Sequence, residues 1–304
     1  MMTFLCAVLA ISILTACNNQ TNKNDENKIT IGFMASLGAV PYIYALEEGY
    51  YEDAGIEVEI KIFTNANDRD AALMGKHIDA VNTDYVMFAD LLEKGHKLVA
   101  TATTEDKFFI VANKTYTEKI TNDVKSTNNA TVGTFENGVL SYLVEKLALD
   151  NNISYKQQGF PMLPARLTAL NENKIDMAIL PDPFASKVGG KIVWDNIESN
   201  NLVTTLAFYE DFIDQNEKLV KDFFNATDEA ITKLEAASDD VIKDYIVKHK
   251  LLTPEDANIV NLQDYSKLVL PNKDNFDPVM AWMVQKDLIK EAYNLDDVVF
   301  DWRK

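Results

Sequence analysis

Apolar and polar residues alternate with two different periods from residue 28 onward. Lys28 to Met34 alternates with a period of two, which predicts a strand, and Pro41 to Glu52 carries apolar residues at helical spacing. The succession of strand and helix then continues, and it predicts one βαβαβ unit. Its remaining segments are a strand over Ile56 to Ile62, a helix over Asp68 to Lys76 and a short buried strand over Ile78 to Val81.

The same order of elements occurs a second time. Residues of one type recur at a constant offset of 97 positions, and Thr30-Ile31-Gly32 matches Thr131-Val132-Gly133 at an offset of 101. Two copies of one unit are therefore expected. The matching pairs are Arg69 and Arg166, Ala72 and Ala169, Leu73 and Leu170, Ile78 and Ile175, Asp79 and Asp176, and Ile56 and Ile153. The second copy has predicted strands at Ala130 to Gly133, Ile153 to Gln157 and Ile175 to Leu180, and predicted helices at Gly138 to Leu149 and Leu163 to Asn173.

Strands that alternate with helices predict an α/β protein with mostly parallel sheets flanked by helices. Lys97 to Thr103, Phe108 to Asn113 and Asn201 to Phe208 are strand-like runs outside the two copies, so the chain is expected to cross from one lobe to the other and back. We assign residues 28–105 and 206–304 to lobe one and 106–205 to lobe two. Hinge motion is expected around 101–106 and 202–205.

The last part of the chain is predicted to be helical. Two of its helices are expected to begin at an N-cap acceptor followed by proline, Thr253-Pro254 and Asp277-Pro278, because proline has no N–H to lose at the first helical position. The predicted helices are Asn216 to Ala237, Asp239 to His249, Pro254 to Leu262 and Pro278 to Tyr293.

The amino terminus has the pattern of a bacterial lipoprotein signal peptide. An apolar run from Phe4 to Leu14 leads into Thr15-Ala16-Cys17, where small residues precede the cysteine that takes up the lipid. A membrane-spanning anchor or a buried helix is the alternative, but the run is short of the roughly 20 residues that span a bilayer. We expect residues 1–16 to be removed, Cys17 to be lipidated, and the polar residues 17–27 to tether the body outside the cell membrane.

Charge and composition exclude several classes of function. The formal charge of −18 repels polyanions, so nucleic acid is not expected as a partner. The second cysteine, Cys6, lies in the expected signal peptide, which leaves the mature chain without a thiol for catalysis. His77, His96 and His249 lack the spacing of a zinc site, and no metal or cofactor is expected. The protein is expected to be a monomer.

Four stretches together resemble a known family. Residues 45–59 (ALEEGYYEDAGIEVE) look like the motif of solute-binding proteins of ABC importers for nitrate, sulfonates and taurine, and thiamine pyrimidine precursors. The stretches at 75–80 (GKHIDA), 170–179 and 180–184 (LPDPF) are similar to other parts of that family. The resemblance implies a two-lobed type II periplasmic-binding-protein fold that closes on a solute, with an ABC permease and an ATPase as partners.

Ligands of open α/β sheets bind at the carboxyl ends of the strands, where helix N-termini present free N–H groups. Gly38 and Gly138 are expected to let the backbone approach a ligand, and polar residues to orient it. The candidate residues are Ser36, Leu37, Gly38, Tyr42, Asn82, Thr83 and Asp84 in lobe one, and Phe135, Glu136, Asn137, Gly138 and Asp182 in lobe two.

Several candidates have a structural alternative. Asp84 and Thr134 are equally explained as helix caps, and Tyr42, Tyr85 and Phe135 either stack on a flat ligand or belong to the core. Arg69 and Arg166, paired by the repeat, are interpreted as scaffold residues.

The candidate loops carry carboxylates at Asp84, Glu136 and Asp182 and no Lys or Arg. This favours a neutral or cationic heteroaromatic solute, such as an aminopyrimidine related to thiamine, over a sulfonate or nitrate. The alternatives are sulfonate, taurine or nitrate held by helix N-termini, a tethered sensor domain, and a pyrimidine-pathway enzyme of the same fold. We expect a binding protein and not an enzyme.

Overall fold

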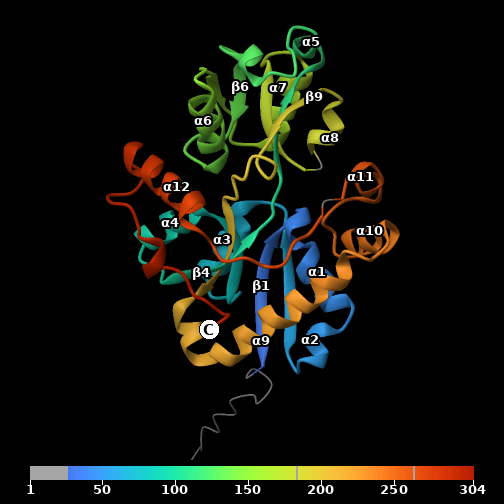
Figure 1. Ribbon diagram of the computed structural model, residues 1–304, viewed down its shortest axis with the longest axis vertical. Coiled ribbons are helices and arrows are strands. Elements are labelled where there is room, and N and C mark those ends of the chain that lie inside the picture. Colours follow the sequence, from blue (N-terminus) through green and yellow to red (C-terminus); the bar gives the residue numbers. More distant parts are fainter. Residues whose placement is uncertain (1–26, 183, 263) are drawn as a thin grey trace, which may run out of the picture.

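The computed structural model describes residues 27–182, 184–262 and 264–304, and the expected signal peptide, Cys17 and nearly all of the expected tether lie outside them. Its strands form two five-stranded sheets, one above the other in Figure 1. We call the part of the chain around the lower sheet lobe one and that around the upper sheet lobe two. The strand orders are β2-β1-β3-β10-β4 and β7-β6-β8-β5-β9.

Lobe one has its first three strands in parallel and β10 antiparallel between β3 and β4. Lobe two repeats this plan, because β6 pairs in parallel with β7 and β8 while β5 runs antiparallel between β8 and β9. The two-lobed α/β fold expected from the sequence is thus confirmed. The strands are β1 (Lys28–Met34), β2 (Glu57–Phe63), β3 (Ala80–Asp84), β4 (Leu98–Thr104), β5 (Phe108–Ala112), β6 (Thr131–Thr134), β7 (Lys156–Gly159), β8 (Met177–Pro181), β9 (Lys191–Asp195) and β10 (Thr204–Tyr209).

The repeat recurs in atomic detail. The Asp79 carboxylate accepts a hydrogen bond from the backbone N–H of Thr30 at 2.8 Å, and Asp176 accepts one from Thr131 at the same distance. Gly32 and Gly133 lie under the side chains of the matched isoleucines, where an added Cβ would be 2.7 and 2.5 Å from their Cδ1 atoms. The turn before the third strand is therefore built by the same residues in both lobes.

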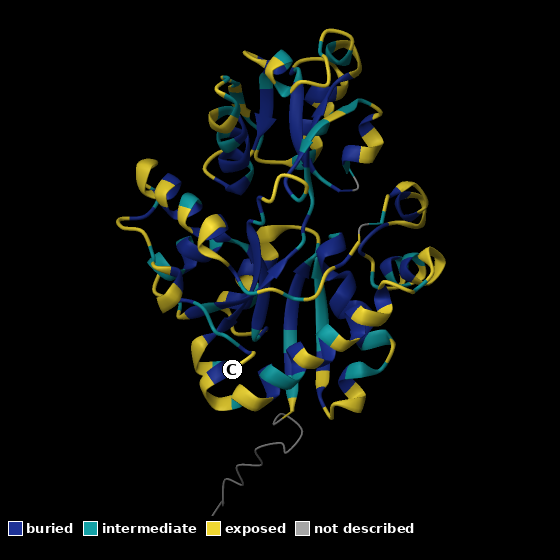
Figure 2. Cartoon of the chain, viewed as in Figure 1, coloured by how far each residue is buried: buried dark blue, intermediate teal, exposed yellow. Residues whose placement is uncertain are grey.

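Helices cover both faces of each sheet, and the buried strands lie between them (Figure 2). The longest, α9, packs Phe223 and Phe224 against Tyr42, Tyr51 and the strands of lobe one. Within the described part of the chain, no helix has the length and apolarity needed to cross a bilayer. The helices are α1 (Val40–Glu47), α2 (Tyr50–Asp53), α3 (Ala66–Met74), α4 (Tyr85–Glu93), α5 (Lys114–Thr117), α6 (Val139–Asn151), α7 (Leu163–Asn171), α8 (Phe184–Val188), α9 (Glu210–Leu234), α10 (Asp239–Lys248), α11 (Pro254–Ile259) and α12 (Lys273–Gln285).

Three predicted helices differ from the observed ones by more than three residues at one end or by a break. The helix predicted over Pro41 to Glu52 is divided because Gly49 adopts a left-handed conformation with φ of 82°. The long helix begins at Glu210, and its predicted start, Asn216, is instead a kink with φ of −135°.

Pro278 lies inside α12 instead of opening it. The helix begins earlier because the Asn272 side chain accepts from the backbone N–H of Asn275 at 3.0 Å, and this start buries Phe276, Val279, Met280 and Met283. The Thr253-Pro254 start is confirmed, since the Thr253 hydroxyl accepts from the backbone N–H of Asp256 at 3.2 Å.

Candidate functional site

A buried carboxylate joins the two predicted binding loops of lobe one. The Asp106 carboxylate accepts hydrogen bonds from the Ser36 hydroxyl at 2.5 Å, from Asn82 Nδ2 at 2.9 Å and from the Thr104 hydroxyl at 3.0 Å. Asn82 Nδ2 lies 2.8 Å from the Thr104 hydroxyl as well. Ser36 follows β1, Asn82 lies in β3, and Asp106 starts the crossing from β4 to β5, so the cluster lies where lobe one meets the hinge. We call these four residues the Asp106 cluster.

Gly38 makes room for this carboxylate. A Cβ added at Gly38 would lie 2.6 Å from Asp106 Oδ1 and 2.8 Å from its Cγ, closer than non-bonded carbon approaches in proteins. The predicted role of Gly38 was close backbone approach to a ligand. In the structure the group that approaches is Asp106.

The charge of Asp106 has no ion-pair partner among the described residues. Its side chain is 5% exposed, and its hydrogen-bond donors are two hydroxyls and an amide, all neutral. A buried carboxylate is costly unless donors or a cation compensate its charge. The cluster therefore leaves this edge of lobe one negative.

Asp182 brings a second buried carboxylate from lobe two. It follows β8, is 7% exposed, and accepts from the Ser186 hydroxyl at 3.4 Å. Burial raises the pKa of Asp182 above its usual 3.8, and the Ser186 hydrogen bond and the charge of Lys107 oppose that rise. The backbone N–H of Asp182 donates to the carbonyl of Lys107 at 3.3 Å, which fixes it beside the hinge.

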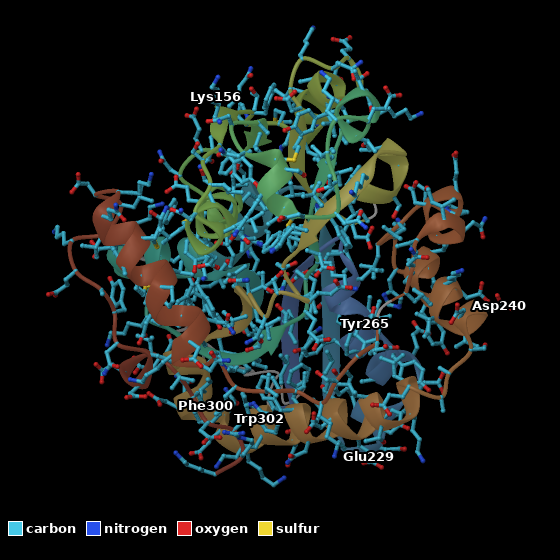
Figure 3. All side chains as sticks on the ribbon, turned by 45° about the horizontal axis from the view of Figure 1, so that its top comes forward. Lys156, Glu229, Asp240, Tyr265, Phe300 and Trp302 are labelled. Carbon is cyan, nitrogen blue, oxygen red and sulfur yellow. The ribbon has the colours of Figure 1, made fainter. Side chains whose placement is uncertain are left out.

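Tyr265 is 5% exposed and lies beside the predicted binding loop at Leu37. Its hydroxyl donates to the carbonyl of Leu37 at 3.1 Å. Burial, followed by the negative charges of Glu105, Asp106 and Asp182, raises the pKa of Tyr265 far above its ordinary value. The Tyr265 hydroxyl therefore stays protonated and remains a hydrogen-bond donor. In Figure 3 Tyr265 lies on the side of lobe one nearest lobe two, away from Glu229 and Trp302.

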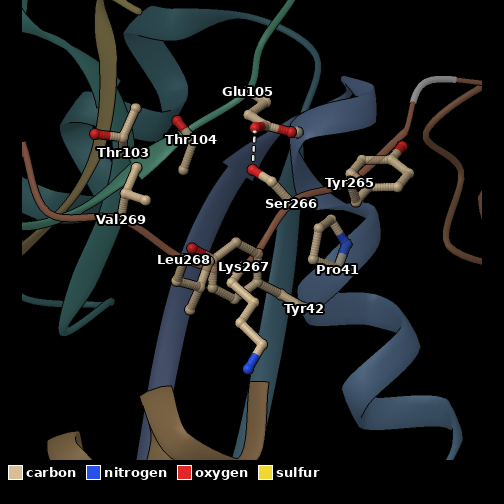
Figure 4. A pocket seen from close by; sticks show the side chains of 11 residues that line it. Pro41, Tyr42, Thr103, Thr104, Glu105, Tyr265, Ser266, Lys267, Leu268 and Val269 are labelled. Carbon is tan, nitrogen blue, oxygen red and sulfur yellow. Dashed lines mark hydrogen bonds between the residues drawn. The ribbon is translucent and has the colours of Figure 1, made fainter. Parts of the chain in front are cut away.

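The segment that carries Tyr265 crosses the edge of lobe one and covers a small cavity (Figure 4). Val269 accepts from the backbone N–H of Thr103 at 2.8 Å, and Ser266 donates to Glu105 at 2.7 Å. The cavity encloses about 20 Å³, which is room for one water molecule. It is too small for a solute, so the candidate site is the carboxylate-lined edge between the lobes.

The structure gives two other lobe-one candidates a structural role and buries a third. Asp84 caps α4, since its carboxylate accepts from the backbone N–H groups of Val86 and Met87, both at 3.0 Å. Tyr42 is 1% exposed, and its ring centroid lies 4.9 Å from that of Phe33. Tyr42 is therefore a core residue, which was the structural alternative for it. Thr83 is buried with a hydroxyl that has no hydrogen-bond partner among the described residues.

The candidates of the loop after β6 lie at the rim. Phe135 is 44% exposed, and its ring covers Gly138, where a Cβ would lie 2.6 Å from Cδ1. Glu136 is exposed and lies against Gly159, and Asn137 has a left-handed φ of 56°. Gly138 is the N-cap of α6. Thr134 does not cap that helix, and its buried hydroxyl has no partner among the described residues.

Asp106 is the functional candidate that sequence reasoning placed only in the hinge. Its neighbours in the chain, Glu105 and Lys107, are also charged, and nothing in the local sequence marks it as buried. The signal available was its position directly after a crossing strand. The described residues contain no group of three or more His, Cys, Asp or Glu able to hold a metal ion.

Several solved structures share this architecture. The periplasmic aliphatic sulphonate binding protein from Escherichia coli matches with a TM-score of 0.73 and 13% identity, covering 90% of this chain and 92% of that one. The zinc-bound ligand-binding component of an ABC-type import system from Staphylococcus aureus matches with a TM-score of 0.68 and 17% identity. The match covers 90% of this chain and 97% of that one. The periplasmic nitrate-binding protein from Synechocystis PCC 6803 matches with a TM-score of 0.61 and 16% identity, and the match covers 82% of this chain and 74% of that one.

At these identities the structural matches show a shared fold. No curated protein matches the chain in sequence. A family model does match, over residues 22–246, which is most of the chain and includes both copies of the repeat and both crossings between the lobes. The chain belongs to the NMT1-like family.

Proposed function

We propose that the protein is the substrate-binding component of an ABC importer and captures a small solute between its two lobes. Three solved structures of this fold carry names that describe import or binding of a solute, including sulphonate and nitrate. Residues 28–105 with 206–304 form one closing body and 106–205 the other. The partners of the protein are a permease and an ATPase. The protein works outside the cell membrane, to which a lipid on Cys17 anchors it.

The solute class follows from the charge of the site. Asp106 and Asp182 bring two buried carboxylates to one edge, and their side-chain hydrogen-bond donors are neutral. A cationic or amine-bearing ligand would compensate both charges. The exposed ring of Phe135 at the rim of lobe two offers a face for a flat ligand. A neutral or cationic heteroaromatic solute, of the thiamine-pyrimidine type, meets these requirements.

Binding of an anion is the second candidate function. It is favoured by the sulphonate- and nitrate-binding proteins of this fold and by Gly138, the N-cap of α6, because the first N–H groups of a helix have no intrahelical acceptor. The two buried carboxylates would oppose an oxyanion there. A sensor domain would use the same site. Catalysis by a cysteine nucleophile is not proposed, since the described residues contain no cysteine.

A thermal-shift panel tests the proposal. Thiamine, its pyrimidine precursors, taurine, alkanesulfonates and nitrate are added to the purified protein, because a ligand that binds only the folded state raises the melting temperature. We expect stabilisation by the heteroaromatic compounds. Stabilisation by sulfonates or nitrate alone would overturn the solute class while leaving the binding function in place.

A further inference from the structure

Two contacts between helices of opposite lobes differ in character. On one side α6 of lobe two meets α12 and α4 of lobe one, and on the other side α8 of lobe two faces α11 of lobe one (Figure 1). The two contacts lie on opposite sides of the crossing strands. Their packing decides which of them separates when the cleft opens.

The α6–α12 contact is a packed interface. The Trp282 ring meets Tyr142 edge-on with centroids 5.8 Å apart, and both residues are buried. Glu145 of α6 accepts from Trp282 Nε1 and from Lys286 Nζ, each at 2.9 Å. One apolar cluster continues from α6 through α4 to Phe276 of α12, so this side belongs to a core shared by both lobes.

The α8–α11 contact is an ion pair. Lys187 Nζ lies 2.5 Å from Asp256 Oδ1, and 39% of the Lys187 side chain is exposed. The apolar residues of α8 belong to a cluster confined to lobe two, and Ala257 of α11 belongs to the core of lobe one. An ion pair with one half-exposed partner is weak and is screened by salt.

We propose that the cleft opens between α8 and α11, that the Lys187–Asp256 pair is its closure contact, and that the α6–α12 interface is the pivot. Apolar surface at the pivot stays buried during such a rotation, whereas the ion pair breaks without exposing a core. Lys187 and Asp256 would thus be positioning residues that raise solute affinity without touching the solute.

The position of the pair ties it to the site. Lys187 lies in α8, which begins two residues after Asp182, and Asp256 lies in α11, which precedes the segment that carries Tyr265. Separation of α8 from α11 moves the segment that carries Tyr265 away from α8 and from Asp182. This role in affinity rests on the proposed function, but the geometry of opening does not.

Spin-label distances measure the opening in the full chain without any solute. Cys6 and Cys17 are replaced by serine, and labels are placed at exposed positions, with Ile192→Cys and Glu255→Cys across the mouth and Leu149→Cys and Val284→Cys across the pivot. We expect Lys187→Met to lengthen the mouth distance and to leave the pivot distance unchanged. The charge-swapped double variant Lys187→Asp, Asp256→Lys should restore the mouth distance.

Lys174→Met is the matched control, because Lys174 pairs with Glu172 within lobe two, and it should change neither distance. About 1 M NaCl should reproduce the effect of Lys187→Met in the wild-type mouth pair. An unchanged mouth distance in Lys187→Met, or a lengthened pivot distance, would overturn the proposal.

Solute binding is read separately with thiamine as the probe. Loss of one exposed ion pair is expected to speed thiamine dissociation about two- to fivefold in Lys187→Met. If thiamine does not bind the wild type, the proposed class of solute is wrong. The spin-label distances across the mouth and the pivot still test the proposed geometry of opening.

Discussion

Arg69 and Arg166 make the same hydrogen bond in opposite lobes. Arg69 donates to the carbonyl of Asn82 at 3.0 Å, and Arg166 donates to the carbonyl of Ile179 at 2.6 Å. Each arginine thereby ties the second helix of its unit to the strand that ends at the candidate site. The repeat seen in the sequence is a repeat of this brace, and its arginines are scaffold residues.

The two braces should respond differently to removal of the charge. Arg69 is paired with Asp70 at 2.7 Å, and both are buried, so Arg69→Met leaves an uncompensated carboxylate and should destabilise the protein by about 3–5 kcal/mol. Arg166 has no such partner among the described residues, and burial lowers its pKa to about 10. Arg166→Met should therefore cost only about 1–2 kcal/mol. Urea unfolding of both variants measures the difference, and equal losses would refute this explanation.

Gly38→Ala should weaken solute binding and also destabilise the protein, because it takes donors from a buried carboxylate. The added methyl would displace the Asp106 carboxylate from Ser36 and Asn82, since its Cβ would lie 2.6 Å from Oδ1. We expect the dissociation constant for thiamine to rise about tenfold, as for loss of one charge-assisted hydrogen bond. Ser36→Ala removes a donor without adding bulk and is the matched comparison. Wild-type affinity in Gly38→Ala would show that Asp106 does not shape the site.

Binding of a cation should become weaker as the pH falls. Burial raises the pKa of Asp182 above its usual 3.8, and a bound cation favours the ionised form and would lower that pKa again. Binding should therefore release protons, and affinity should fall as the pH drops through the raised pKa.

Thiamine is the ligand here because its thiazolium ring carries a permanent positive charge. Calorimetry in two buffers of different ionisation enthalpy measures the protons released. In Asp182→Asn the release should disappear, and a release that persists would assign the proton to another group.

The elements of this fold were predictable because both faces of the sheets are covered, so apolar periodicity is strong. Errors arose where one local signal competed with another. Asp277-Pro278 reads as a helix start, but Asn272 offers a cap that buries more of α12. At Gly49 a left-handed residue divides what reads as one helix, and such a φ leaves no trace in apolar spacing.

The site was predictable only in part. The rule for strand ends placed Ser36 and Asn82 at one edge of the sheet, and the structure brings both side chains to Asp106 there. Asp106 was expected only in the hinge, because its contacts with Ser36 and Asn82 span 70 and 24 positions of the chain. Asp84 lies at the end of a strand, as predicted, but its carboxylate accepts hydrogen bonds from the start of α4 and acts as the cap of that helix.

Isothermal titration of thiamine and its pyrimidine precursors into the wild type, Asp106→Asn and Asp182→Asn is the most direct measurement of the central claim. The control is Asp211→Asn, because the Asp211 carboxylate pairs with Lys76 Nζ at 2.8 Å elsewhere on lobe one. We expect each site variant to bind about 10- to 100-fold more weakly and the control to bind as the wild type does. Unchanged affinity in both site variants would mean that the buried carboxylates do not hold the solute.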